Sequence, residues 1–210
     1  MPSLVEKYFS QADLDAIEAA VKKAESSTSG EIVVELSSHS RHWNTEALVH
    51  GLIVSVVVMI AVVYFTYDMG WGVYFNTPQA LLWGAIGFVA AYFGWGRFLK
   101  RRERKRRVVW NRALGIFHHL TPTRGGTGVL IFVSLEEDQA AIVADTGIAS
   151  KVPEDYWRKP HGIIVDAMKQ GKHAEGIVQA IDTIAVELAA HFPRESDDVN
   201  ELPDKPRISD

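Results

Sequence analysis

The sequence predicts a small α/β domain whose mixed sheet is interrupted by a hairpin of two apolar helices. Three short segments rich in Val, Ile and Leu have the composition of strands, and they alternate with longer segments whose apolar residues recur at helical spacing. Between the first and second of these strands lies a block, residues 47–96, with one charged side chain, Asp68. Such a block inside an otherwise highly charged chain excludes a simple cytosolic enzyme.

The apolar block reads as two membrane-spanning helices. Residues 47–67 contain no Lys, Arg, Asp or Glu, and a helix of that length reaches about 30 Å, the thickness of a hydrocarbon core. A second run, residues 80–99, is free of charge up to Arg97. Helices of a soluble core are seldom apolar on every side over such lengths. We therefore expect a transmembrane hairpin over residues 47–99, with a short external loop at 68–79.

The distribution of Lys and Arg predicts the orientation of this hairpin. The loop has none, whereas seven of the eight residues directly after the second run are basic: Lys100, Arg101, Arg102, Arg104, Lys105, Arg106 and Arg107. The positive-inside rule then places both termini in the cytoplasm, in a two-span protein of the inner (cytoplasmic) membrane. Beside a membrane span, these basic residues are expected to bind lipid headgroups rather than nucleic acid.

The rest of the chain supplies a split cytoplasmic domain, residues 1–40 plus 100–192. Ser10 offers an N-cap for a helix with apolar positions from Leu14 to Ala24. The expected strands are 31–37, 129–133 and 140–144, and the further expected helices surround 109–117, 153–170 and 174–191, with a break or kink at Pro160 and Gly162.

The C-terminal segment, residues 193–210, is expected to be an acidic, flexible tail. Residues 195–210 carry six acidic and two basic side chains. The net charge of this segment is therefore −4, the same as that of the whole chain. The domain itself is therefore close to neutral, and no overall field attracts nucleic acid. The chain has no cysteine, which excludes disulfides, thiolate metal sites and cysteine nucleophiles.

Several segments resemble the TPM-domain family, which is named after a thylakoid-lumen protein, a photosystem II repair protein and an acetylcholine-receptor auxiliary protein. The resembling segments are SGEIVVEL (29–36), Thr121 to Arg124 before GVLIFVSLE (128–136), ADTGI (144–148) and HFPRESDDVNELPD (191–204). The resemblance implies an α/β sandwich with a sheet of about four strands, one more than periodicity finds. It also implies one of three roles, since members are acid phosphatases, divalent-metal binders or partners of membrane complexes.

Topology predicts a candidate site independently of the family. A helical crossover makes the first two strands parallel, and a tight turn makes the third antiparallel. Glu31, the segment from Arg124 to Thr127, and Asp145 then meet at one end of the sheet. Glu31 and Asp145 are candidate ligands for Ca²⁺ or another divalent cation, and Asp145 is also a candidate phosphoryl-accepting nucleophile. Arg124, Gly125 and Gly126 are candidates for binding an anion.

Structural alternatives stay open for each of these residues. Asp145-Thr-Gly is an ordinary Asx-type turn, Glu31 is a possible helix cap, and Arg124 is a possible ion-pair partner for either carboxylate. No strong catalytic motif is present. The predicted function is a membrane-tethered accessory module that acts on or with another membrane protein and binds a divalent cation. The alternative is a metal-assisted acid phosphatase.

Overall fold

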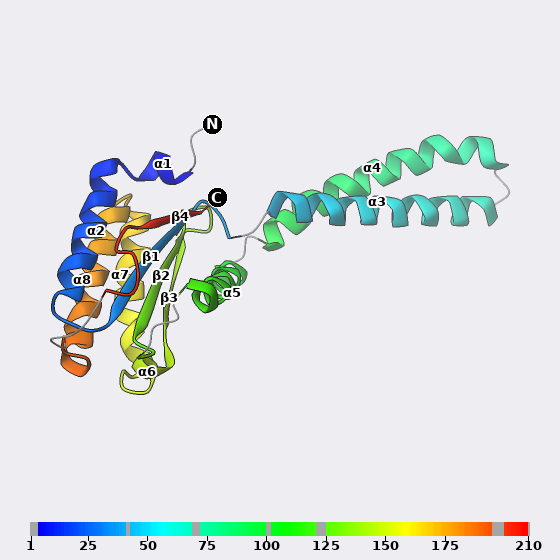
Figure 1. Ribbon diagram of the computed structural model, residues 1–210. Coiled ribbons are helices and arrows are strands. Elements are labelled where there is room, and N and C mark those ends of the chain that lie inside the picture. Colours follow the sequence, from blue (N-terminus) through cyan, green and yellow to red (C-terminus); the bar gives the residue numbers. More distant parts are fainter. Residues whose placement is uncertain are drawn as a thin grey trace. The chain divides into compact units, whose positions relative to one another are not determined.

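The computed structural model describes residues 4–40, 43–68, 72–99, 102–120, 125–194 and 200–209. The chain divides into two compact units, residues 1–40 with 106–210 and residues 41–105. The first unit is built of helices and a sheet, and the second is a pair of helices (Figure 1). The predicted α/β class is confirmed.

A four-stranded sheet lies at the centre of the first unit, in the order β3-β2-β1-β4. The strands are β1 (Glu31–Ser37), β2 (Gly128–Ser134), β3 (Gln139–Ala144) and β4 (Arg207–Ser209). β1 and β2 are parallel, and β2 and β3 are antiparallel. This is the arrangement predicted from the helical crossover and the tight turn.

The fourth strand comes from the segment expected to be a flexible tail, so for Arg207–Ser209 that expectation is wrong. β4 runs parallel to β1, with Arg207 opposite Glu35 and Ser209 opposite Ser37. The amide of Ser38 also donates to the carbonyl oxygen of Ser209 at 3.0 Å. A strand of three residues has too short an apolar pattern to be found from periodicity, which is why three strands were counted where the sheet has four.

Three long helices cover one face of the sheet: α2 (Gln11–Glu25), α7 (Arg158–Lys169) and α8 (His173–His191) (Figure 1). Alternate strand residues, such as Ile32 and Ile131, belong to the core on this face. The shorter elements are α1 (Leu4–Tyr8), α6 (Thr146–Ala149) and the 3₁₀ helix η1 (Glu154–Trp157).

A single helix, α5 (Arg102–Leu120), packs on the opposite face (Figure 1). Its residues Val109, Ala113 and Phe117, spaced four apart, form a second core with the strand residues that alternate with the first set, including Leu130 and Phe132. Because both faces are covered, every residue of β1 and β2 is buried. β2 therefore reads as a continuous apolar run, whereas β1 also buries Glu31 and Glu35.

Local signals explain how two of the helices begin. Ser10 caps α2 as predicted: its hydroxyl accepts from the amide of Asp13, and the Asp13 carboxylate accepts from the amide of Ser10 at 2.8 Å. α7 is continuous through Pro160 and Gly162, so the expected break is wrong. Pro160 is the third residue of α7, in the first turn, where its missing amide hydrogen costs no intrahelical hydrogen bond.

The second unit consists of α3 (Trp43–Asp68) packed along α4 (Gly72–Leu99). α4 begins eight residues before the second apolar run and continues through Pro78, so the expected loop at 68–79 is wrong: only residues 69–71 separate the two helices. The expected loop was wrong because the start of an apolar run in the sequence does not fix the residue at which the helix starts.

Glycines bring the two helices close together. A Cβ atom added at Gly84 would lie 2.5 Å from Cγ of Met59, and one added at Gly51 would lie 3.0 Å from the ring of Phe88. Small residues at such contacts are typical of helix pairs in lipid, where close packing replaces the hydrophobic effect as the main attraction.

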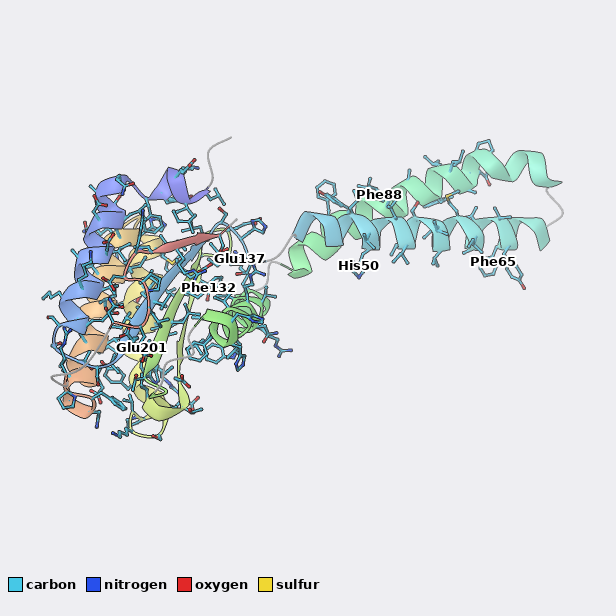
Figure 2. The ribbon with its side chains drawn as sticks, in the orientation of Figure 1. His50, Phe65, Phe88, Phe132, Glu137 and Glu201 are labelled. Atoms are coloured by element: carbon cyan, nitrogen blue, oxygen red, sulfur yellow. The ribbon has the colours of Figure 1, made fainter. Side chains whose placement is uncertain are left out.

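The outer surface of this unit is apolar. In the stretch Leu48–Phe65, with a mean hydropathy of 2.6, only 6% of the residues are buried, and Phe65 projects away from its helix (Figure 2). In the part of the chain that the structure describes, this is the one helix long and apolar enough to cross a membrane; the apolar stretch Pro78–Gly94 in α4 is shorter. The second predicted span stays a prediction.

The contact between α7 and α8 yields the first testable prediction. A Cβ atom added at Gly176 would lie 2.3 Å from Cβ of Ala167, so we expect Gly176→Ala to destabilise the protein by about 1–3 kcal/mol through overpacking. Gly162→Ala is the matched control, because a Cβ there meets nothing within 4 Å and Ala favours helix by up to about 1 kcal/mol. Denaturant unfolding of the purified chain measures both; equal effects would contradict the prediction.

Candidate functional site

The structure brings the backbones of the predicted site together at one end of the sheet. Glu31 pairs with Gly128 across β1 and β2, and the amide of Asp145 donates to the carbonyl oxygen of Gly128 at 2.9 Å. The three residues therefore form one row across three strands. Two strand spacings, about 10 Å, separate the backbones of Glu31 and Asp145, and their side chains have different partners.

The Asp145 side chain caps the short helix α6. Its Oδ1 accepts from the amide of Thr146 at 2.6 Å and from the Thr146 hydroxyl at 3.2 Å. This is the local turn that the sequence left open as the alternative. One carboxylate oxygen is thus used in capping, and roles as a metal ligand or nucleophile stay predictions.

The glycine-rich segment before β2 packs on the backbone of α6. A Cβ atom added at Gly147 would lie 2.7 Å from the carbonyl oxygens of both Gly125 and Gly126, and Gly126 has a φ of +64°. Glycine is therefore required here for close backbone approach. At this contact the carbonyl oxygens of Gly125 and Gly126 point toward Gly147. Carbonyl oxygens repel an anion. Arg124 lies outside the described residues, so the anion-binding role stays a prediction.

Glu31 instead contacts the C-terminal segment. Its carboxylate, on a residue only 5% exposed, accepts from the backbone amides of Glu201 and Leu202, both at 3.3 Å. Leu202 in turn packs on the core beneath α5. A buried carboxylate is costly unless hydrogen-bonded, and the tail supplies two of the donors that Glu31 uses.

A second buried carboxyl group, Glu25 at the end of α2, lies beside Glu31. It is 8% exposed, and its Oε1 accepts from the amide of Ile32 at 3.1 Å. Burial, and then repulsion from Glu31 and Asp204 together with a hydrogen bond to Asp204, raise the pKa of Glu25 to about 8 against the opposing effect of the Ile32 amide. Glu25 therefore holds its proton to a much higher pH than an exposed glutamate does.

Glu25, Glu31 and Asp204 thus gather three carboxyl groups from α2, β1 and the tail. Such oxygen ligands suit a hard cation, which could take the place of the proton on Glu25. Among the described residues, no group of three His, Asp or Glu side chains is already arranged to hold a metal ion. A cation would need Glu31 to give up its tail amides.

Sequence reasoning found Glu31 but missed Glu25 and Asp204. Glu25 follows the apolar face of α2 directly and resembles an ordinary solvated end of a helix. Asp204 lies in a segment without periodicity. Neither position carries a local signal of the cluster, because the residues meet only when the tail contacts Glu31 at the start of β1.

The other end of the sheet holds a separate polar cluster around Glu137. This residue, in the turn after β2, is 1% exposed. Its carboxylate accepts from the amide of Ser40 at 3.0 Å and from the hydroxyl of Ser134, and the hydroxyl of Ser40 donates to that of Ser134 at 2.8 Å. Glu137 and Glu201 lie toward opposite ends of the sheet (Figure 2). Glu137 therefore fixes the segment by which the chain leaves β1 toward α3.

Comparison with known proteins identifies the domain. Residues 104–187, from α5 into α8, match the family model of the TPM domain. This part of the chain is therefore similar to the TPM domain. The family resemblance read from the sequence is confirmed for this part of the chain, whereas the match does not extend to the apolar helices.

A solved structure supports the same fold. The protein is similar to BA42 from the psychrophilic bacterium Bizionia argentinensis, whose structure was determined by NMR, with a TM-score of 0.60 and 24% sequence identity. The alignment covers 95% of this chain and 94% of that chain. At this identity the similarity shows the TPM-like fold alone. No curated protein matches the chain.

The raised pKa of Glu25 predicts how stability depends on pH. The folded state holds the Glu25 proton more tightly than the unfolded state, in which the pKa is near 4.5. The stabilisation is therefore complete below about pH 4.5 and is lost as the pH rises through about 8. We expect the thermal midpoint to fall between pH 6 and 9, and Glu25→Gln to remove much of that fall. Glu154→Gln, at an exposed position, is the control and should keep the wild-type profile; a Glu25→Gln profile equal to wild type would contradict the prediction.

Proposed function

We propose that the protein is a membrane-tethered accessory module, in which a TPM domain is held at the cytoplasmic membrane and acts with another membrane protein. The observation that carries this proposal is the insertion, between β1 and α5 of the domain, of a helix pair in which only 6% of the residues of the apolar stretch Leu48–Phe65 are buried. Soluble proteins rarely expose contiguous apolar surface on this scale. The proposal includes two spans, with both termini in the cytoplasm.

The candidate site favours an accessory role over catalysis. Both carboxylate oxygens of Glu31 accept hydrogen bonds from backbone amides, and one oxygen of Asp145 caps α6, so both residues serve the fold and only the second oxygen of Asp145 lies outside these bonds. A nucleophile or general base needs free lone pairs directed at a substrate. An accessory role requires only a stable domain at a defined place on the membrane.

The orientation makes a direct prediction. Reporters of compartment fused at position 74 and at the C-terminus should give opposite signals, with the C-terminal reporter in the cytoplasm, because the basic residues after α4 resist translocation. The control is a variant in which the basic residues from Lys100 to Arg107 are changed to neutral residues. This variant should show a weaker asymmetry between the two signals. Identical signals at the two positions would contradict the two-span arrangement.

We further propose that a divalent cation binds the carboxyl cluster that contains Glu31, in exchange for the proton on Glu25. The support is the group of three carboxyl groups with a raised pKa at Glu25. Binding should displace the tail amides from Glu31 and be weak for that reason.

Cation binding has a distinctive pH dependence. Millimolar Ca²⁺ should raise the thermal midpoint of the purified chain more at pH 8.5 than at pH 6.5, because the competing proton is lost through about pH 8. Glu31→Gln should abolish the shift. Asp145→Asn tests whether Asp145 is also a ligand, since only a ligand would reduce the shift. The absence of a shift at both pH values would remove the site, and a metal-dependent phosphatase activity lost in Asp145→Asn would favour the enzymatic alternative.

A further inference from the structure

The helix α5 has two different sides. Its inner side buries Val109, Ala113 and Phe117 against the sheet, and Leu114 and Ile116 pack partly buried beside them. Trp110 is 45% exposed, although Trp is a large apolar side chain that soluble domains usually cover. The surface of α5 around Trp110 is thus free for contact with something outside the domain.

From residue 104 onward, the charge on α5 has one sign. From residue 104 to residue 120 the sequence contains five Lys or Arg and no Asp or Glu. Arg106, Arg107 and Arg112 are exposed, and none of the ion pairs among the described residues involves them. Unpaired guanidinium groups on one helix, beside an exposed Trp, favour an anionic partner with an apolar layer next to it.

The covalent chain limits where that partner lies. α4 ends at Leu99 and α5 begins at Arg102, and three residue steps span at most about 11 Å. The first turn of α5 is therefore tied to the end of an apolar helix. If that helix lies in a bilayer, the start of α5 lies at the level of the headgroups.

From these observations we propose that the exposed side chains of α5, Arg106, Arg107, Trp110 and Arg112, form a docking surface for anionic phospholipid headgroups. The proposal rests on the proposed membrane tether and adds the face by which the TPM domain meets the bilayer. Each basic residue near an anionic surface favours contact by about fivefold. Arg binds phosphate through two parallel hydrogen bonds, and the Trp ring suits the interface between headgroups and hydrocarbon.

Single labels on the full chain test this surface. The sequence has no cysteine, so Asn111→Cys on α5, Val186→Cys on α8 and Val56→Cys on α3 each give one fluorophore. Val186 is 73% exposed, on a helix that covers the opposite face of the sheet. The labelled proteins are placed in nanodiscs whose lipids carry nitroxide quenchers, made of phosphatidylcholine alone or mixed with phosphatidylglycerol.

We expect the label at position 111 to be quenched in phosphatidylglycerol nanodiscs, less so in phosphatidylcholine, and the label at 186 to be quenched in neither. High salt should reverse the quenching at 111. Changing Arg106, Arg107 and Arg112 to Gln should lower the ratio of docked to undocked protein by about a hundredfold. Lys151→Gln, a basic residue next to α6, is the control and should have no effect.

The outcomes separate this inference from the proposed function. Quenching at position 56 without quenching at 111 would keep the membrane tether and overturn the docking surface. The absence of quenching at 56 would overturn both. Binding of an oligonucleotide through the same Arg residues, with no phosphatidylglycerol-dependent quenching at 111, would assign the surface to nucleic acid and overturn the proposal.

Discussion

The parallel pairing of β1 and β2 is the constraint on which the architecture depends. Parallel neighbours cannot be joined by a tight turn, so the chain must make a long crossover between Ser37 and Gly128. α5 lies in that crossover and covers the second face of the sheet. The two apolar helices are inserted in the same connection, after β1 and before α5. The crossover therefore accommodates the two apolar helices without breaking any strand pairing.

The burial of Glu31 makes the C-terminal segment part of this fold. A carboxylate at the start of a central strand loses water on folding, and the amides of Glu201 and Leu202 replace it. Glu25 meets the same problem differently, because it retains its proton to a pH of about 8. One carboxyl group is thus stabilised by donors from the tail, and its neighbour by remaining neutral.

Much of the domain could be predicted because its signals are local. The capping box at Ser10 and Asp13 and the apolar run of β2 depend on residues adjacent in sequence. β4 and the Glu25–Glu31–Asp204 cluster could not be predicted, since they exist only after residues some 170 positions apart meet, as Glu31 and Glu201 do. The burial of Glu137 could not be predicted for the same reason. In the sequence it is one of three acidic residues in a turn, and its burial depends on Ser40, 97 positions away.

The tail forms hydrogen bonds at both ends of β1, and it therefore connects the carboxyl cluster with the segment that follows the strand. At the start of the strand its amides bind Glu31, and beyond the end of the strand Ser209 accepts from the amide of Ser38. Ser38 lies two residues before Ser40, which Glu137 fixes where the chain leaves for α3. β1 is buried along its whole length, and close-packed strands do not deform gradually. The tail therefore ties the carboxylate of Glu31 at the start of β1 to the segment where the chain leaves that strand.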